Sequence, residues 1–168
     1  IISDYNKGIC TESVTKDIIN KASELQIPVF IDPKGKRWDK YYGAAIITPN
    51  LKEAEEAIGR KLITDKDVET AGKEICEDLN LGACLITRGP NGMSYIGKDV
   101  VFHVCSEAKE IYDVSGAGDT VIASFAAGKL VGFDSSTVTR FANKAAGIVV
   151  GHIGTTAITI PELKKGSN

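Results

Sequence analysis

Short apolar runs alternate with segments of helical periodicity along most of this sequence, and this rhythm limits the folds that it can form. The runs at residues 28–31, 44–47 and 83–87 are too short for helices and are bounded by turn residues. Between them, apolar residues recur at spacings of three and four behind helix-capping residues. The alternation predicts an α/β fold of three layers, with a mostly parallel sheet and helices on both faces.

The expected helices each have a start signal in the sequence. They begin at Thr11, Asn50, Thr64 or Asp65, the segment 113–119, and Asp134, and end near residues 25, 58, 79, 130 and 149. In the first helix, one face is expected to hold the apolar residues Val14, Ile18, Ile19, Ala22 and Leu25. A turn at Gly89–Gly92 precedes an expected hairpin of residues 93–96 and 100–104.

The composition of the 168 residues excludes several classes of protein. Apolar residues make up 43% and charged residues 25%, which is typical of a globular chain and not of a disordered one. The net charge is -2 without a basic run, and no apolar stretch reaches the ~20 residues that span a bilayer. We therefore expect part of one cytoplasmic domain over residues 1–168, without nucleic-acid or membrane partners.

The cysteines and the first residues add two expectations. Cys10, Cys76, Cys84 and Cys105 fit no zinc-binding spacing and are expected as free thiols in a reducing compartment. The opening Ile1-Ile2 looks like a strand that is entered midway, so the chain is expected to be part of a longer polypeptide.

The segment at residues 113–120 carries the clearest chemical signal. Gly116 and Gly118 lack a Cβ, so a phosphate can approach the backbone closely. The amides of Ala117, Gly118 and Asp119 would lie at the N-terminus of the next helix, where the helix dipole is positive. A carboxylate at residue 119 would repel that phosphate unless it faces a substrate hydroxyl and accepts its proton. The segment is either the active centre of a kinase acting on an alcohol or an ordinary helix start with an acidic first turn.

Other phosphate-binding motifs are missing from the sequence. There is no G-x-x-x-x-G-K-[ST] segment, and Val121 stands where G-x-G-x-x-G requires its last glycine. Instead, Gly116-Ala117-Gly118-Asp119 after Asp113-Val114-Ser115 resembles the signature of the ribokinase (PfkB) family of sugar kinases. This resemblance implies that Asp119 is the catalytic base and that the backbone of Gly116, Ala117 and Gly118 forms the anion hole. It also implies ATP as the phosphoryl donor and Mg²⁺ as its counter-ion.

Further motifs of the family follow in the expected order. Asn50-Leu51-Lys52-Glu53 resembles N-x-x-E, which implies that Asn50 and Glu53 organise Mg²⁺ and the phosphates; the same pair also fits a helix capping box. Thr87-Arg88-Gly89 with Gly92 is similar to the strand and turn that contact the nucleotide. Asn143 matches a position near the adenine.

A narrower resemblance concerns one branch of the family. Four segments resemble the D-glycero-D-manno-heptose 7-phosphate kinases, which occur alone or as the kinase domain of a bifunctional ADP-heptose synthesis protein. These segments are Ser3–Gly8, Asp32–Gly35, Thr48–Asn50 and Val149–Thr155. This implies phosphorylation of C1 of the sugar phosphate for lipopolysaccharide core synthesis, a homo-oligomer, and a possible fused adenylyltransferase domain. The resemblance covers the second half of the family fold, without the half that supplies most sugar contacts and the lid. Other family kinases for ribose, fructose or nucleosides, or a non-catalytic ATP-binding fragment, remain alternatives.

Candidate ligand residues stand at the expected strand ends and beside the anion hole. Lys7 and Lys34 are candidates for the substrate phosphate, and Asp4 and Asp32 for orienting the substrate or a metal; the alternative for each lysine is a solvated side chain. The family resemblance further implies a K⁺ site. Its candidate ligands are Asp113, Ser115 and the carbonyls of Val149, His152 and Gly154. The side chains of His103 and His152 are expected to be structural, and those of Trp38, Tyr41 and Tyr42 are expected to pack a loop.

Overall fold

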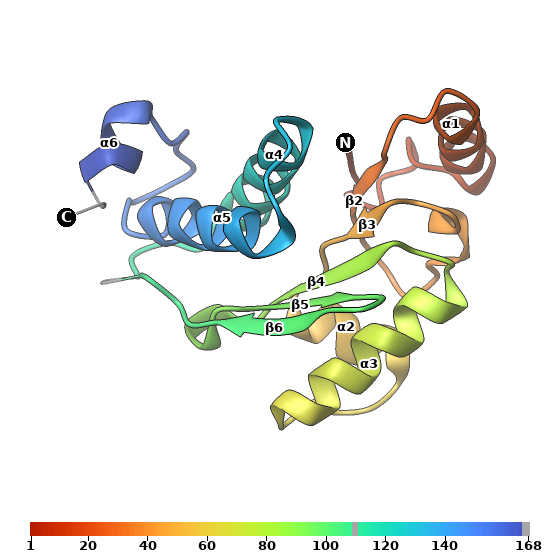
Figure 1. The fold of residues 1–168 in the computed structure, drawn as a ribbon, viewed down its shortest axis with the longest axis horizontal. Coiled ribbons are helices and arrows are strands. Elements are labelled where there is room, and N and C mark those ends of the chain that lie inside the picture. The colour runs from red at the N-terminus through yellow and green to blue at the C-terminus, as the bar shows by residue number, and fades with distance from the viewer. Residues whose placement is uncertain (109–110, 166–168) are drawn as a thin grey trace. The chain divides into compact units, whose positions relative to one another are not determined.

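In the computed structural model, which describes residues 1–108 and 111–165, six strands form one sheet in the order β1-β2-β3-β4-β5-β6 (Figure 1). The strands are β1 Ile2–Ser3, β2 Phe30–Asp32, β3 Ile46–Ile47, β4 Ala83–Thr87, β5 Met93–Gly97 and β6 Val101–Val104. Strands β1 to β4 are parallel, with Ile2 opposite Ile31 and Ile47 opposite Cys84. Strands β5 and β6 form the expected hairpin, which makes the sheet mixed. The predicted strands are therefore confirmed, although β2 and β3 are shorter than their apolar runs.

The chain divides into two compact units, residues 1–87 with 94–102 and residues 88–93 with 103–168. The first unit holds α1 Glu12–Glu24, η1 Asp39–Tyr41, α2 Leu51–Ile58 and α3 Asp65–Asp78. Each α-helix begins where a side chain can accept a backbone amide hydrogen: Thr11, Asn50 and Thr64 are the N-caps. Helix α2 ends at Gly59, which adopts the left-handed conformation that favours glycine.

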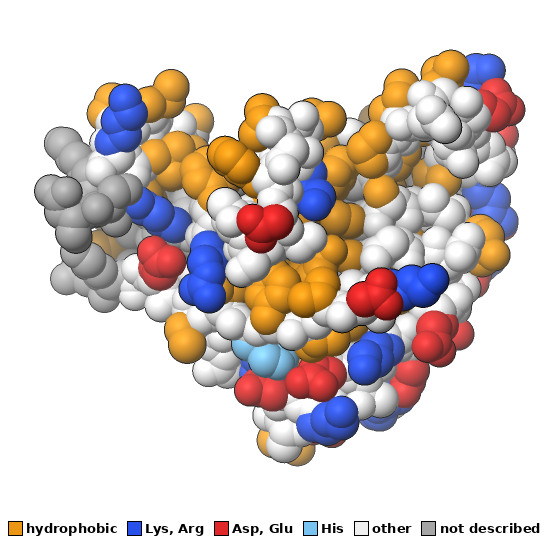
Figure 2. Space-filling view, viewed as in Figure 1, with side chains coloured by type: hydrophobic (Ala, Val, Ile, Leu, Met, Phe, Trp, Pro, Cys, Tyr) orange, Lys and Arg blue, Asp and Glu red, His pale blue; other side chains and the backbone are white. Residues whose placement is uncertain are grey.

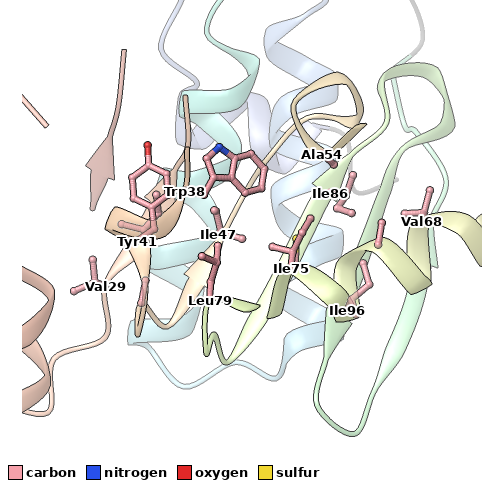
Figure 3. Packing of buried hydrophobic residues seen from close by; sticks show 14 of the residues in the cluster. Val29, Trp38, Tyr41, Ile47, Ala54, Val68, Ile75, Leu79, Ile86 and Ile96 are labelled. Carbon is pink, nitrogen blue, oxygen red and sulfur yellow. The ribbon is translucent and has the colours of Figure 1, made fainter. Parts of the chain in front are cut away.

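One face of the sheet packs against these helices to form the core of the first unit (Figure 3). Ile47 and Ile86 project from the strands toward Ile75 of α3 and its C-cap Leu79, and Ile31 belongs to the same buried cluster. Gly72 lets α3 approach β5 closely, since a Cβ there would lie 2.7 Å from the side chain of Ile96. Trp38 and Tyr41 close one end of this core, which confirms that they pack in the structure. The same prediction was wrong for Tyr42, because its side chain is exposed.

The predicted apolar face of the first helix was right for Ile19, which is buried, and for Ala22, which packs against the core, but wrong for the other three residues. Val14 and Ile18 are 45% and 46% exposed, and Leu25 is exposed as well, whereas Thr15 and Ile19 are buried. The helix turns the stripe of Thr15 and Ile19 inward because the threonine methyl group can pack like an apolar side chain. A pattern search that counts threonine as polar misses this stripe.

The second unit contains η2 Gly89–Asn91, α4 Ala117–Leu130, α5 Ser135–Val149 and α6 Ile160–Lys165. Asp134 caps α5 by accepting the amides of Ser136 and Thr137. Helices α4 and α5 cross closely at Gly128, where a Cβ would lie 2.2 Å from Val138. From its composition, the polar segment Lys164–Asn168 is predicted to be a tail. The structure places Lys164 and Lys165 in α6, and residues 166–168 lie outside the described chain.

Charges of both signs are interleaved on the surface. Figure 2 shows acidic and basic side chains alternating around α3, where Arg60 pairs with Glu74 at 2.7 Å and Lys66 with Glu69 at 3.4 Å. This face therefore offers no stripe of one sign. Among the described residues, no helix combines the length and the apolar character that a membrane crossing needs.

Candidate functional site

The N-terminus of α4 differs from those of α1, α2, α3 and α5 in how it is capped. Thr11, Asn50, Thr64 and Asp134 place a side-chain oxygen over the first turns of α1, α2, α3 and α5. At α4 the N-cap is Gly116, with φ 79°, and no side chain caps the helix. A Cβ at this position would lie 3.2 Å from the methyl group of Thr155. Because first-turn amides have no acceptor within a helix, this end can receive an anion.

The predicted catalytic residues lie together in this first turn. Ala117, Gly118 and Asp119 are the first three residues of α4, and the side chain of Asp119 is exposed. The amide of Ala117 donates to the carbonyl of Val114 at 3.2 Å, which tightens the turn before the helix. The amide of Thr120 donates to the carbonyl of Gly116 at 2.9 Å, so Gly118 and Asp119 lie between two backbone hydrogen bonds of the turn. An exposed carboxylate and a helix N-terminus share one turn, as the sequence predicted.

Asp113 ties the loop before α4 to the loop after α5. Its Oδ1 accepts the amide of Ser115 at 2.8 Å, and its Oδ2 accepts the amide of Gly154 at 3.2 Å. The hydrogen bonds from Ser115 lower the pKa of Asp113, and the hydrogen bond from Gly154 lowers it by a smaller amount. The carbonyl of Val150 accepts the amides of Tyr112 and Asp113 at 2.8 and 3.3 Å, which fastens the same two loops a second time.

The structure thus brings together part of the predicted K⁺ site. Asp113, Ser115 and Gly154 are joined by hydrogen bonds, and the carbonyl of Val149 accepts the amide of His152 at 3.1 Å. Whether these oxygens, together with the carbonyls of His152 and Gly154, hold a cation stays a prediction. The imidazole of His152 lies 3.4 Å from Glu162 of α6. Across the described ranges, no cluster of three or more His, Cys, Asp or Glu side chains could hold a metal.

Gly92 and Asn143, both predicted to contact the nucleotide, hold the same backbone segment. A Cβ on Gly92 would lie 1.9 Å from the carbonyl oxygen of Val104 and 2.7 Å from the backbone of Cys105. The buried Asn143 donates from Nδ2 to the carbonyl of Cys105 at 2.7 Å. Gly89 adopts φ 56° in the turn and has open space around its Cα. These contacts give Gly92 and Asn143 a packing role that spacing alone did not reveal.

Asn50 and Glu53 form the capping box that the sequence suggested as one alternative. The amide of Asn50 donates to Glu53 Oε2, and the amide of Glu53 donates to Asn50 Oδ1, both at 2.9 Å. Thr87 lies beside them, because its amide donates to the carbonyl of Pro49 at 2.9 Å. Lys34 Nζ lies 2.8 Å from Glu53 Oε1, and this carboxylate raises the pKa of Lys34. A lysine predicted for the substrate therefore pairs with a residue predicted for the nucleotide.

Asp4, another candidate for substrate binding, is buried and occupied by protein partners. Its carboxylate accepts hydrogen bonds from Lys40 Nζ, from the Tyr41 hydroxyl at 2.7 Å and from the amide of Asn6 at 2.7 Å. Burial raises the pKa of Asp4, but these hydrogen bonds outweigh burial and the pKa lies below its ordinary value. Burial and the bond to Asp4 raise the pKa of Tyr41 far above its ordinary range.

Sequence reasoning missed the polar roles of Lys40 and Tyr41, since neither stands at a strand end. The remaining substrate candidates are Lys7 and Asp32. Lys7 is exposed in the loop after β1. Asp32 ends β2, and its carbonyl accepts the amide of Asp4 at 3.0 Å. Whether any of the four candidates contacts a substrate stays a prediction.

Comparison with known proteins gives one family. The profile of the pfkB family carbohydrate kinases matches residues 5–163. Among curated proteins, the bifunctional protein HldE of Mesorhizobium japonicum is 42% identical over 163 residues, which cover 97% of this chain and 33% of that protein. HldE of Pseudomonas putida strain GB-1 is 45% identical over 168 residues, covering 98% of this chain and 34% of the relative. The chain thus spans about a third of the length of these relatives.

Solved structures share the fold at lower sequence identity. Phosphofructokinase-2 from Escherichia coli in complex with potassium has a TM-score of 0.83 at 19% identity, over 92% of this chain and 51% of that one. Ribokinase from Arabidopsis thaliana, complexed with ribose and ATP, has a TM-score of 0.78 at 23% identity, over 90% of this chain and 49% of that one. These likenesses confirm the predicted ribokinase-like fold class and its partial extent.

Proposed function

Because the chain belongs to the pfkB family of carbohydrate kinases, we propose that it is the nucleotide-binding and catalytic part of an ATP-dependent sugar-phosphate kinase. The acceptor that we propose is D-glycero-D-manno-heptose 7-phosphate, phosphorylated at C1 on the route to ADP-heptose and the lipopolysaccharide core. The similarity to HldE proteins over nearly the whole chain supports this acceptor. A fused adenylyltransferase domain in the parent protein is part of the same proposal.

The observation that carries the kinase assignment is the first turn of α4. A helix start without a side-chain cap, opened by Gly116 in a left-handed conformation, suits a phosphoryl group. Asp119 lies in that turn and takes the proton from the acceptor hydroxyl while the hydroxyl oxygen bonds to the γ-phosphorus of ATP, the bond from that phosphorus to ADP breaks, and ADP leaves. The backbone amides of the turn stabilise the negative charge on the phosphoryl oxygens during transfer. One turn thus supplies both the base and the anion site.

The residues also fit the groups that the family uses. ATP supplies the phosphoryl group, and Mg²⁺ neutralises part of its charge. Both oxygens of Glu53 already accept hydrogen bonds, so Asn50 and Glu53 fit an outer shell around Mg²⁺ better than direct ligation. K⁺ beside Asp113 would hold the loop before α4 in place; potassium in the E. coli phosphofructokinase-2 structure supports this part.

The test is an assay of ADP release by the intact parent protein with MgATP and K⁺. Replacing Asp119 by Asn keeps the shape of the side chain and removes the base, so turnover should fall by about 10²–10⁴-fold. The Kd for ATP should stay within a few-fold. Asp99→Asn, an exposed aspartate in the β5–β6 turn, is the matched control and should behave as the wild type. Loss of ATP binding in Asp119→Asn would contradict the role as base.

The choice of acceptor decides the finer part of the proposal. Heptose 7-phosphate, ribose and fructose are compared under the same conditions. Turnover with heptose 7-phosphate alone supports the sugar-phosphate kinase. Turnover with a free sugar would assign the protein to another branch of the family.

A further inference from the structure

A pocket of about 440 Å³ opens in the first unit between the loop after β1 and the loop after β2. Residues 6–12 form one wall and residues 34–40 form the other, and the N-cap Thr11 places the start of α1 at the pocket. The volume falls within the ~300–1,000 Å³ of small-molecule sites. Both loops follow the carboxyl ends of parallel strands, which is where α/β sheets bind ligands.

The pocket lining is rich in positive charge. The lining contains Lys34, Lys36, Arg37 and Lys40 but only two acidic residues, Glu12 and Asp39; Lys34 and Lys40 pair with Glu53 and Asp4 outside the lining. Glu12 is already paired with Lys16 at 2.8 Å, outside the lining. An excess of cations around one opening is unfavourable in the empty protein and becomes favourable when an anion enters. In a chain whose net charge is -2, the weakly paired cations of this lining, Lys36 and Arg37, are not a consequence of composition.

Two of the four cations are fixed by the fold. Lys40 Nζ is held by Asp4 and by the carbonyl of Cys10 at 3.0 Å, and only 15% of its side chain is exposed. Lys34 is held by Glu53, and its amide donates to the Tyr41 hydroxyl at 3.2 Å. These bonds set the backbone of the loop after β2 without help from a ligand.

The other two cations are held weakly. The side chain of Arg37 is 83% exposed, and its nearest carboxylate oxygens, on Glu12 and Asp39, lie at 3.7 and 4.0 Å. Lys36 is exposed and has no ion pair among the residues that the structure describes. Exposed pairs at these distances contribute little to stability, so both side chains can turn toward a ligand.

We propose that this pocket binds the phosphate monoester end of the acceptor sugar, with Lys36 and Arg37 as the residues that select a phosphorylated over an unphosphorylated sugar. The inference rests on the proposed function, because it names the acceptor subsite of that kinase. Arginine offers paired donors to phosphate oxygens, and lysine adds a mobile point charge. The ammonium group of Lys40 is neutralised by Asp4, so it shapes the wall of the pocket and leaves the selection to Lys36 and Arg37.

The kinetic test uses the intact parent protein and the double variant Lys36→Ala/Arg37→Ala. The apparent KM for the sugar phosphate should rise by about tenfold for each lost charge-assisted contact, while the KM for ATP stays unchanged. Lys66→Ala, an exposed lysine of α3 whose nearest carboxylate lies at 3.4 Å, is the control and should change neither KM. An unchanged KM for the sugar phosphate would refute the proposal. A rise in the KM for ATP alone would place the nucleotide in this pocket instead.

A second experiment separates this proposal from the kinase assignment. Lysines of the intact protein are labelled with an amine-reactive reagent, with or without sugar phosphate, free sugar or inorganic phosphate, and each site is read by mass spectrometry. Sugar phosphate and phosphate should protect Lys36 but not Lys66, and the free sugar should protect neither. Protection without turnover would contradict the kinase and keep the phosphate site. Turnover without protection would contradict the site and keep the kinase.

Discussion

Gly92 offers the sharpest structural prediction, because one added methyl group meets backbone and not side chain. In Gly92→Ala the new Cβ would lie 1.9 Å from the carbonyl oxygen of Val104 and 2.7 Å from backbone atoms of Cys105 and Ser106. The residue also has φ 75° and ψ -128°, a region that alanine rarely adopts. The conformation costs about 1–2 kcal/mol and the forced shift of the segment about 1–3 kcal/mol. The free energy of unfolding should therefore fall by about 2–5 kcal/mol.

Gly89 in the same turn is the matched control. It also has a positive φ, of 56°, but a Cβ there would meet nothing within 4 Å. Gly89→Ala should therefore cost only the conformational part, about 1–2 kcal/mol. Urea titration of the intact protein, followed by hydrogen exchange of peptides from residues 88–106, measures both variants. Equal losses in the two variants would refute the argument that the turn must approach residues 104–106 closely.

Two further variants test the first unit. Asp4→Asn leaves Lys40 without its carboxylate and should lower the free energy of unfolding by about 2–4 kcal/mol. The pKa of Asp4 lies below its ordinary value of 3.8, so the contribution of its carboxylate to the free energy of unfolding is complete above that pH and is lost as the pH falls through the folded-state pKa. Urea titrations below pH 4 should therefore show that the free energy of unfolding falls less steeply with pH in Asp4→Asn than in the wild type. Thr64→Ala removes the cap of α3 and should cost about 1 kcal/mol, and Thr70→Ala, exposed on the same helix, should cost less.

The parts of the fold that depend on neighbouring residues could be predicted from the sequence. The caps at Asn50, Thr64 and Asp134 bond to amides two or three residues further on, so their spacing is visible in the sequence. The turn of Gly116 and Asp119 is also visible in the sequence, because the candidate base lies only three residues after the start of the helix. At these positions the family motifs and the rules of helix capping give the same prediction, because both depend on the same short segments of sequence.

The parts that depend on distant residues could not be predicted. Asp4 and Lys40 are 36 positions apart, and nothing in the spacing marks them as a pair. Gly92 was expected at the nucleotide, and its approach to the backbone of Val104 emerges only when β5 and β6 are folded. Thr15 takes a core position that its polar hydroxyl disguises. In each case tertiary packing decides the role of a residue whose local signal is neutral or misleading.

The polar residues that follow β1, β2 and β3 are linked to one another by hydrogen bonds and an ion pair in the absence of a ligand. Tyr41 donates to Asp4 and accepts the amide of Lys34, Lys34 pairs with Glu53, and Glu53 caps α2 at Asn50. A substrate phosphate that recruited Lys34 would have to share it with Glu53 and would weaken that chain of contacts. A phosphate that recruited the weakly held cations beyond Lys34 would leave the chain intact. The loop after β2 therefore separates two tasks: its first lysine orders the strand ends, and the residues after it meet the ligand.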